Sequence, residues 1–271
     1  EVVTVHDLTC IRFPEMCTAD TLQVPDLLRR ALRRGAWVHT VSAHVAGEVV
    51  DAFDVDPARV AAIPNGAPAP LAVELRAELA AQGRRRAGAE RFVLALGTLE
   101  PRKDIPSLVR AFDELAVDDP DLHLVLAGAD GWGAEAVVEA IAATAAGARR
   151  RIRRLGWVDD PDRSALLAGA AVFAYPSRYE GFGLPPLEAL AAGTPVVATT
   201  VGALPEVLDD AAQWAPPGDA DALAAALRSV LGDPARAQAI VSAGERRLDA
   251  FSWDRTADEL VALYRRSAAA R

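Results

Sequence analysis

The sequence predicts an α/β protein in which parallel sheets are covered by helices on both faces. From residue 92 onward, short strands that are apolar almost throughout alternate with stretches of helical period or length. Continuously apolar strands indicate burial on both faces, and each parallel crossover needs a helix to return the chain. Of the 271 residues, 51% are apolar and 25% are charged. This composition excludes extended disorder and fibrous or low-complexity structure.

The first 66 residues resemble only the second half of such a domain. A strand at 2–5 begins abruptly, with no methionine or element before it. A helix at 25–34, a strand at 37–41, a helix that Ser42 can cap and that runs to about residue 53, and a strand at 60–63 follow. Pro64-Asn65-Gly66 is a breaker sequence, and 67–70 has the composition of a linker between domains.

The larger domain is predicted to occupy residues 67–250. Its strands are expected at 92–97, 122–127, 152–155, 171–175 and 195–199, with a helix at 105–115. Residues 251–271 carry a final helix, at about 255–266, that is free to pack on either domain, the N-terminal one included. The pattern is Rossmann-like. Chemistry is therefore expected in the loops beyond the carboxyl ends of the strands, after Gly97, Ala127, Tyr175 and Thr200.

The charge balance argues against nucleic acid as the main ligand. The 29 basic and 38 acidic residues give a formal charge of −9, whereas a phosphate backbone is bound by a basic stripe. The arginine clusters at 84–86 and 149–154 are short and isolated, so we interpret them as solvated surface rather than as a lipid or nucleic-acid patch. No apolar run reaches the roughly 20 residues of a membrane helix, and no basic-then-apolar leader opens the chain. The sequence predicts a cytoplasmic protein.

Two rare residue types give further indications. Cys10 and Cys17 are too few for a disulfide framework or a zinc site, and we interpret both as ordinary thiols, although the sequence allows one bridge between them. Lys103 is the only lysine among 29 basic residues. In so arginine-rich a chain, it is a candidate for a role that needs a compact point charge.

The loop after the predicted strand 171–175 combines glycines with a helix start. Gly181 and Gly183 allow backbone amides to approach a ligand closely. Pro185 or Pro186 suits the first turn of a helix, and Gly193 suits its end. Unpaired N–H groups at a helix start favour an anion such as phosphate.

The same segment carries two acids, Glu180 and Glu188, eight positions apart. Phosphate alone would repel them, but a nucleotide sugar offers hydroxyl groups on both sides of its phosphates, and carboxylates accept hydrogen bonds from hydroxyls. The alternative interpretation is a glycine-rich turn followed by proline, with two solvated acids.

The loop after the predicted strand 92–97 carries adjacent cations, Arg102 and Lys103. Such a pair at the carboxyl end of a parallel strand neutralises a diphosphate and stabilises charge on a departing one. The alternative is a pair of surface cations bound to Glu100 or Asp104. No G-x-G-x-x-G motif follows a strand, and the chain has neither a P-loop nor a nucleophile elbow.

Together these segments resemble the donor domain of the retaining glycosyltransferases of family 4, also called group 1. The matching segments are G-T-L-E-P-R-K-D at 97–104, the glycines and tryptophan at 127–132, G-W-V at 156–158, E-G-F-G-L-P-P-L-E at 180–188 and G-A-L-P-E at 202–206. Residues 5–8, 40–42 and 63–66 are similar to the later part of the family's N-terminal domain. The resemblance covers nearly the whole chain, and the two glutamates with seven residues between them are its most specific part.

The resemblance implies the GT-B fold, in which two Rossmann-like domains hold a nucleotide sugar between them. Arg102 and Lys103 then match the cations at the donor diphosphate, Glu180 the acid at the donor sugar, and Glu188 the acid at the ribose hydroxyls. His6 matches a histidine that faces the donor sugar, the alternative being a satisfied histidine at a strand end. The backbone amides that contact the donor are implied to belong to Gly181, Phe182, Gly183 and Leu184.

The resemblance also implies hexosyl transfer to an acceptor hydroxyl with no bound metal, and no D-x-D pair stands near the two cations. No cofactor is implied beyond the co-substrate, a UDP- or GDP-sugar. The pattern at 6–8 with Pro14-Glu15 is similar to bacterial mannosyl- and rhamnosyltransferases, which favours GDP-mannose. The acceptor is a glycan, a lipid-linked molecule or a small molecule, and peripheral membrane contact stays open. A GT-B epimerase or hydrolase and a non-catalytic nucleotide-sugar-binding subunit are the alternatives.

Two departures from the family pattern limit the comparison. Some relatives carry arginine where this chain has Thr98, so no phosphate role is carried over to Thr98. The family's first strands, which build much of the acceptor pocket, have no counterpart, so we expect these 271 residues alone to bind a nucleotide but turn over poorly. The sequence leaves a front-face reaction and a covalent glycosyl adduct equally open.

Overall fold

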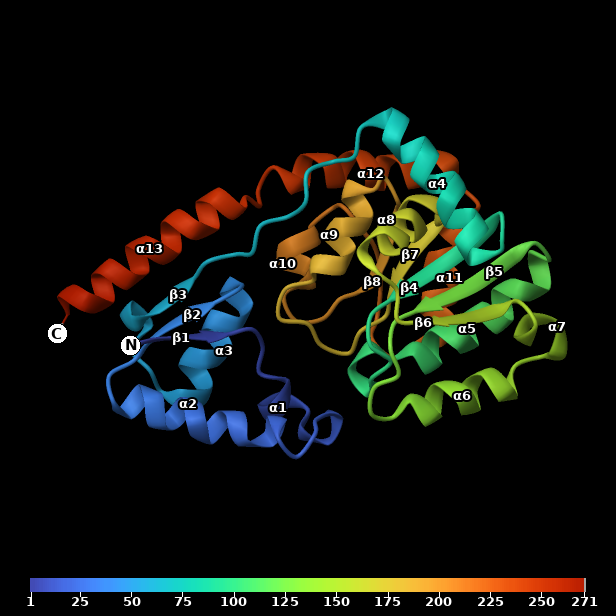
Figure 1. Ribbon diagram of the computed structural model, residues 1–271. Helices are drawn as coiled ribbons and strands as arrows, with labels where there is room; N and C mark the ends of the chain where they lie inside the picture. Colours follow the sequence, from blue (N-terminus) through green and yellow to red (C-terminus); the bar gives the residue numbers. More distant parts are fainter. Residues whose placement is uncertain (271) are drawn as a thin grey trace.

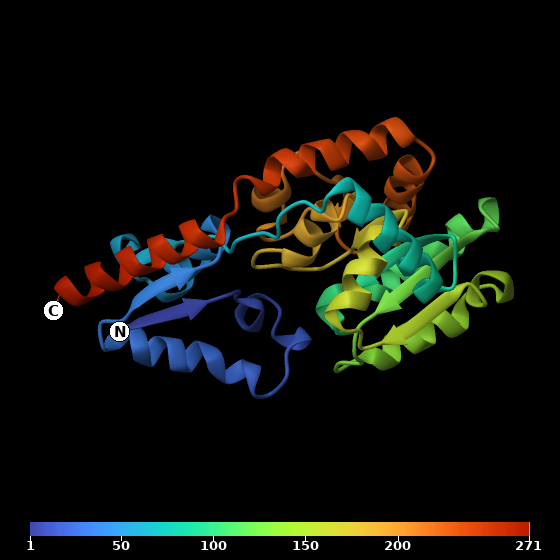
Figure 2. The same ribbon diagram turned by 45° about the horizontal axis from the view of Figure 1, so that its top comes forward.

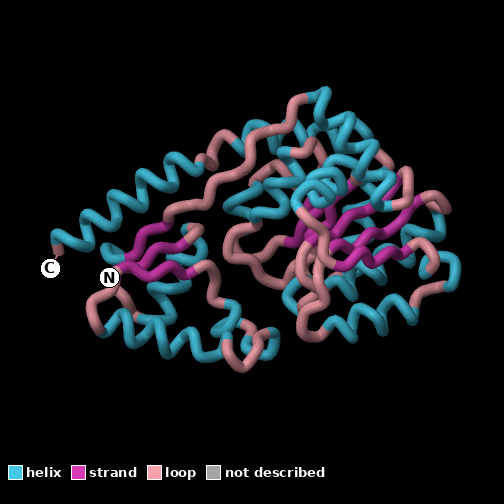
Figure 3. The backbone as a smooth tube through the Cα atoms, viewed as in Figure 1, coloured by secondary structure: helices cyan, strands magenta, loops and turns pink. Residues whose placement is uncertain are grey.

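The computed structural model of the chain describes residues 1–270 and contains two separate parallel sheets (Figure 1 and Figure 3). The smaller sheet has the strand order β1-β2-β3, and the larger has the order β6-β5-β4-β7-β8-β9. Every strand pairing in both sheets is parallel. The α/β class predicted from the apolar strands is confirmed.

The N-terminal unit surrounds the small sheet and has a core of its own. Its elements are β1 (Val2–Val5), α1 (Thr9–Arg12), α2 (Val24–Arg33), β2 (Trp37–Thr40), α3 (Ala43–Phe53) and β3 (Val60–Ala62), with short 3-10 turns at Pro14–Met16, Thr21–Gln23 and Pro57–Arg59. Leu8, Val38 and Val45 are among the buried residues that form this core. Ser42 caps α3 as predicted, because its hydroxyl accepts from the Val45 N–H at 3.1 Å.

The C-terminal unit surrounds the large sheet. Its elements are α4 (Val73–Ala87), β4 (Arg91–Leu96), η4 (Pro101–Lys103), α5 (Ile105–Asp118), β5 (Leu122–Ala127), α6 (Ala134–Ala143), α7 (Ala146–Arg149), β6 (Ile152–Gly156), α8 (Asp160–Gly169), β7 (Val172–Tyr175), α9 (Leu184–Ala191), β8 (Val196–Thr199), α10 (Leu204–Leu208), β9 (Gln213–Ala215), α11 (Ala220–Leu231) and α12 (Pro234–Leu248), and α13 (Trp253–Ala269) ends the chain. The five predicted strands lie close to their expected bounds, whereas α4 and β9 were not foreseen.

The large sheet is buried on both faces. Phe92, Leu94, Leu124 and Phe173 are fully buried, as expected for strands without alternating polarity. α4 packs on α8 and α12 on α9, while α11 packs on α5. The apolar strands therefore lie between two helical layers.

The strand order places a switch point between β4 and β7. From β4 the chain moves outward through β5 to β6, and from β7 it moves the other way through β8 to β9. β4 and β7 themselves pair in parallel, with Val93 opposite Val172. The loops that follow these two strands therefore leave the same sheet edge side by side, at the place where open α/β sheets bind ligands.

The final helix, α13, returns from the C-terminal unit and runs along the N-terminal unit (Figure 1 and Figure 2). The Thr256 hydroxyl donates to the Pro64 carbonyl at 2.6 Å, and the Arg266 guanidinium lies 5.7 Å from the centre of the Trp37 ring. These contacts join the end of the chain to the small sheet. The domain boundaries at 66 and 250 stay predictions.

Two expectations from composition concern the chain as a whole. Within residues 1–270, none of the helices combines the length and the apolar character that a membrane crossing needs. Cys10 and Cys17 are both free thiols, as interpreted from the sequence.

Candidate functional site

The loops after β4 and β7 meet in a buried ion-pair cluster. We call residues 97–104 the cation loop and residues 176–183 the acid loop. Arg102 Nη1 lies 2.7 Å from Glu180 Oε2, and Lys103 Nζ lies 2.8 Å from Glu180 Oε1. The Ser177 hydroxyl donates to Oε1 at 2.7 Å. The structure therefore brings three of the predicted site residues into direct contact.

The two loops are fixed to each other by their backbones as well. The Arg178 N–H donates to the Arg102 carbonyl at 2.7 Å, and Arg178 Nε donates to Asp104 Oδ2 at 2.7 Å. Asp104 ends η4 with a φ of 45° and is buried, and its other carboxylate oxygen accepts from the Ser107 hydroxyl. The left-handed turn that presents Arg102 and Lys103 is thus held against the acid loop.

The alternative interpretation of the cations is partly right for Arg102. Its Nη2 lies 2.7 Å from Glu100 Oε1. Neither cation lies on the surface, however, because the side chains of Arg102 and Lys103 are only 18% and 13% exposed. Glu180 is also 6% exposed, so it is not a solvated acid.

Burial and the neighbouring charges act in opposite directions on the pKa values of the cluster. Burial acts to raise the pKa of Glu180, but Lys103 and Arg102 outweigh it and hold that pKa below its ordinary value. Burial lowers the pKa of Lys103, and Glu180 opposes this effect. For Arg102, burial is outweighed by Glu180 and Glu100, and its pKa is raised. The cluster therefore sets two basic side chains against two carboxylates.

Tyr175 extends the cluster toward the sheet. Its hydroxyl accepts from Lys103 Nζ at 2.8 Å, and the ammonium lies 4.6 Å from the centre of its ring. Burial, followed by Glu180, raises the pKa of Tyr175. Sequence reasoning missed the contributions of Ser177, which stands in the acid loop, and of Tyr175, which ends β7 directly before that loop.

The acid loop leads into α9 as predicted. Gly183 precedes the helix with a φ of 108°, Pro185 and Pro186 lie in its first turn, and Gly193 follows its end with a φ of 78°. A side chain at Gly183 would collide with Leu204, since its Cβ would lie 2.6 Å from Leu204 Cδ2. The Phe182 ring packs edge-on against Phe251 in the core, so only its backbone faces the loop.

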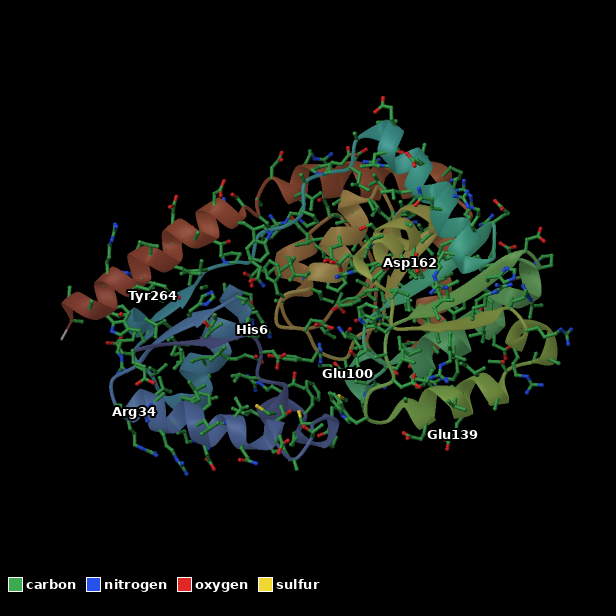
Figure 4. The ribbon with its side chains drawn as sticks, viewed as in Figure 1. His6, Arg34, Glu100, Glu139, Asp162 and Tyr264 are labelled. Carbon is green, nitrogen blue, oxygen red and sulfur yellow. The ribbon has the colours of Figure 1, made fainter. Side chains whose placement is uncertain are left out.

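His6 lies beside the acid loop, on the N-terminal unit. A Cβ on Gly181 would lie 1.9 Å from the His6 carbonyl oxygen, so the two backbones are in contact. Figure 4 shows His6 and Glu100 on the sides of the two units that face each other. The His6 side chain is exposed. The structure thus places the residue next to Gly181, which follows Glu180 in the chain, and its role toward a sugar stays a prediction.

Further contacts seat the acid loop on the N-terminal unit. The Ser42 hydroxyl donates to the Gly181 carbonyl at 2.8 Å, and the Tyr179 hydroxyl donates to Glu48 and accepts from the Leu8 N–H. Nothing in the spacing of Ser42 or Glu48 predicts these contacts.

A second polar contact between the units comes from α10. The Glu206 carboxylate accepts from the N–H groups of Ala43 and His44, at 2.8 and 2.9 Å. These are the first N–H groups of α3, which have no partner within the helix. Glu206 thus acts as a second cap for α3, supplied by the other unit.

Glu188 lies apart from the ion-pair cluster. It stands inside α9, and its carboxylate pairs with Arg163 of α8. Burial raises the pKa of Glu188, and Arg163 opposes that effect. The two side chains line a hollow of about 340 Å³, which we call the Glu188 hollow. Glu180 precedes α9 and Glu188 stands within it, and the role of Glu188 toward a ribose stays a prediction.

The Glu188 hollow is bounded by two helices and the interdomain segment. Its lining consists of Pro68, Ala69, Leu71, Asp160, Arg163, Ser164, Leu167, Glu188, Ala191 and Ala192. One wall is therefore apolar, and the polar groups come mainly from α8. Among residues 1–270, no group of three or more histidines, cysteines and acids is arranged to hold a metal ion.

Comparisons with known proteins agree on one family. The family model described as glycosyl transferases group 1 matches residues 78–247. O-antigen chain mannosyltransferase B of Escherichia coli is 32% identical over 276 residues, which cover 97% of this chain and 70% of that protein. The MMP alpha-(1->4)-mannosyltransferase of Mycolicibacterium hassiacum is 31% identical over 262 residues, covering 95% of this chain and 58% of that protein.

Solved structures give the same result at the level of the fold. Sucrose-phosphate synthase from Thermosynechococcus elongatus superposes with a TM-score of 0.77 at 27% identity, covering all of this chain and 68% of that one. Anabaena Alr3699/HepE, solved in complex with UDP-glucose, gives a TM-score of 0.77 at 23% identity, covering 96% of this chain and 72% of that one. The two-sheet arrangement of this chain is therefore the GT-B fold.

Proposed function

Because this chain belongs to the group 1 glycosyl transferases, we propose that it is a family 4 enzyme that transfers a hexose from a nucleoside-diphosphate sugar to an acceptor hydroxyl, with retention at the anomeric carbon. The observation that carries the proposal is the ion-pair cluster. Arg102, Lys103 and Glu180 converge from two loops at the switch point of the large sheet, where this fold class binds its ligands.

The cations are suited to a leaving diphosphate. As the bond between the sugar and the phosphate breaks, negative charge develops on the phosphate oxygens, and fixed cations that are shielded from water stabilise it. Arg102 and Lys103 are already charged and held in place by Glu180, Glu100 and Tyr175. Two fixed cations supply the neutralisation for which other transferases use a metal, so we propose a metal-independent reaction.

Glu180 is better suited to positioning than to attack. Its carboxylate accepts from Lys103 and Ser177 and forms an ion pair with Arg102, and these interactions draw charge away from both oxygens. A nucleophile needs a free electron pair aimed at the anomeric carbon, whereas a positioning group needs only to accept bonds from sugar hydroxyls. This favours a reaction in which the leaving phosphate itself takes the acceptor proton.

The remaining parts of the donor fit the rest of the site. The backbone amides of 181–184 lie at the start of α9, where an anion is favoured, and His6 lies across from them on the N-terminal unit. We assign the ribose hydroxyls to Glu188. The named activities of the two similar mannosyltransferases support mannose as the transferred sugar.

The acceptor and the cellular setting are the least constrained parts of the proposal. We propose a glycan, a lipid-linked molecule or a small molecule as acceptor, in the cytoplasm, with peripheral contact to a membrane where the acceptor is lipid-linked. The chain spans 70% and 58% of the lengths of the two mannosyltransferases, so these statements concern the protein to which this chain corresponds.

The test is product analysis with a nucleotide sugar labelled in the hexose. The proposal expects labelled glycoside with the donor's anomeric configuration, determined by proton NMR, and loss of transfer in Glu180→Gln and Lys103→Met. Free labelled sugar in place of glycoside would indicate a hydrolase, and a changed sugar on the intact nucleotide an epimerase. Tight nucleotide-sugar binding with no turnover, in a chain of the relatives' full length, would identify a non-catalytic subunit.

A further inference from the structure

We propose that Glu48, acting through Tyr179, positions the ion-pair cluster for the transfer reaction. The inference rests on the proposed function and adds two positioning residues to the same site. Glu48 lies in α3 of the N-terminal unit, whereas Tyr179 lies in the acid loop of the C-terminal unit. The bond between their side chains therefore crosses from one unit to the other.

Tyr179 is bound to both units at once. Its hydroxyl donates to a carboxylate oxygen of Glu48 and accepts from the Leu8 N–H at 3.3 Å, which ties the side chain to the N-terminal unit. Its backbone carbonyl accepts from Arg102 Nη1 at 3.1 Å, and Glu180 is the next residue in the chain. A displacement of the tyrosine therefore moves the acceptor of Arg102 and the backbone of Glu180 together.

Glu48 is held firmly enough to serve as the anchor. Its side chain is only 9% exposed, and Arg12 Nε donates to its Oε1 at 2.8 Å. His44 Nε2 lies 3.5 Å from the same oxygen, so Oε2 is left to Tyr179. A carboxylate that is fixed by a charged partner and shielded from water makes a strong and well-directed bond to a hydroxyl group.

The ring of Tyr179 has little freedom of its own. It is buried, and its centre lies 5.7 Å from that of the Phe13 ring and 6.2 Å from that of the His44 ring. Burial, followed by the bond to Glu48, raises the pKa of Tyr179, so the hydroxyl keeps the proton that it donates. Because an aromatic side chain has few rotatable bonds, holding its hydroxyl also holds its backbone.

The cluster depends on this support because Arg102 and Glu180 act by their positions. A fixed cation stabilises a departing diphosphate only at the place where the charge develops, and a displacement of about 1 Å can cost about a hundredfold in rate. The bond to Glu48 comes from the unit that lies across from the two loops. The cluster therefore has its working geometry only while the two units are in contact.

The first test uses Lys103, the only lysine of the chain. Isotope-labelled lysine gives a single side-chain ammonium signal by NMR, from the group that donates to Glu180. The rate at which this ammonium exchanges hydrogen with water, measured without any ligand, reports how firmly the cluster is closed. The variants are Tyr179→Phe, Glu48→Ala and Glu48→Gln, with the matched control Tyr264→Phe, whose side chain is exposed on α13.

We expect Tyr179→Phe and Glu48→Ala each to raise the exchange rate of the Lys103 ammonium by about fivefold or more, because a bond to a charged group is lost. Glu48→Gln keeps an oxygen that accepts from the Tyr179 hydroxyl, so its rate should stay close to that of the parent. The double variant should change no more than either single variant, since both remove the same link. Tyr264→Phe should leave the rate unchanged.

Transfer kinetics with a nucleotide sugar labelled in the hexose form the second test. Tyr179→Phe is expected to lower kcat by about ten- to a hundredfold, while the KM for the nucleotide sugar changes by less than about threefold, because the remaining donor contacts are kept. A merely structural role would lower the melting temperature and leave the kcat of the folded protein unchanged.

Three results would overturn the inference. An exchange rate in Tyr179→Phe within about twofold of the parent would show that the hydroxyl does not hold the cluster. Additive effects in the double variant would show that the two residues act separately. A faster exchange with an unchanged kcat would remove the positioning role. Absence of transfer by the parent, in a chain of the relatives' full length, would count against the proposed function alone, because the exchange measurement does not depend on it.

Discussion

Replacement of Lys103 by methionine removes the ammonium while keeping a long, unbranched side chain of similar shape. We expect the variant to remain folded but to lose diphosphate binding and catalysis. The loss of folding stability is predicted to be smaller than the loss of function. The ammonium donates to Glu180 and Tyr175, but it is also buried, and removing a buried cation offsets part of the lost bonding. Comparing the change in unfolding free energy with the changes in diphosphate affinity and kcat therefore shows whether Lys103 serves the fold or the reaction.

The stability effect combines losses and a gain. Two hydrogen bonds of 2.8 Å are lost, one of them to a carboxylate, and a bond to a charged group contributes about 1.5–3 kcal/mol. Methionine, however, avoids the cost of burying a cation, the same cost that lowers the pKa of Lys103. Glu180 also keeps Arg102 and Ser177. The net loss of unfolding free energy is expected to be about 1–3 kcal/mol.

The functional effect has no such compensation. A cation lost from the diphosphate is expected to weaken nucleoside-diphosphate binding by about ten- to a hundredfold, and to lower kcat by about a hundredfold or more. The measurements are urea unfolding without ligand, calorimetry with the diphosphate and with the phosphate-free nucleoside, and transfer rates. Nucleoside binding should stay unchanged. A variant whose diphosphate affinity stays within twofold of the parent would refute the role of Lys103.

Three further predictions concern the contacts around the cluster. Glu206→Gln keeps the shape of the side chain but removes the charge that caps α3. The unfolding free energy should therefore fall by about 1 kcal/mol in low salt and by less in high salt, measured by urea unfolding at two ionic strengths. Gly181→Ala forces a methyl group onto the His6 carbonyl and should lower the unfolding free energy by about 1–3 kcal/mol in thermal unfolding. The control Gly47→Ala places its methyl group in open space on α3 and should raise the unfolding free energy by about 0.5–1 kcal/mol. Equal effects of the two substitutions would contradict the contact between Gly181 and His6. Because the folded pKa of Glu180 is depressed, its ionisation stabilises the fold above the ordinary value of 4.5 and loses that effect as pH falls through the lower folded value. The stability difference between the parent and Glu180→Gln should therefore shrink below pH 4.5, and an unchanged difference in acid titration would count against it.

The donor side of the fold could be predicted from sequence because its signals are local. Apolar strands such as 122–127 require burial on both faces, and the prolines after Gly183 fix the start of α9 within a few residues. The cation loop and the acid loop follow strands of the same sheet, so their convergence follows from the edge they share. The structure brings Arg102, Lys103 and Glu180 into contact at that edge, and their roles toward a donor stay predictions.

Other parts of the site could not be predicted, because their partners are distant in the chain. Ser42 was recognised as a helix cap from its neighbours, but its bond to Gly181, 139 residues away, has no local signature. The partner of Glu188 was not predicted either. Its spacing from Glu180 is visible in the sequence, but its partner Arg163 depends on how α8 packs beside α9. Strand β9 has three residues and too little pattern to be recognised.

The seating of the acid loop bears on attempts to recombine this enzyme with its relatives. We consider a hybrid in which the N-terminal unit is exchanged for that of a relative. The new N-terminal unit must supply a hydroxyl at the position of Ser42, which bonds to Gly181, and a carboxylate at the position of Glu48, which bonds to Tyr179. A hybrid without these two groups would keep Arg102, Lys103 and Glu180 and still hold the acid loop less firmly. We therefore expect hybrids that keep residues 40–48 of this chain together with its C-terminal unit to be more active than hybrids joined at the linker, residues 67–70.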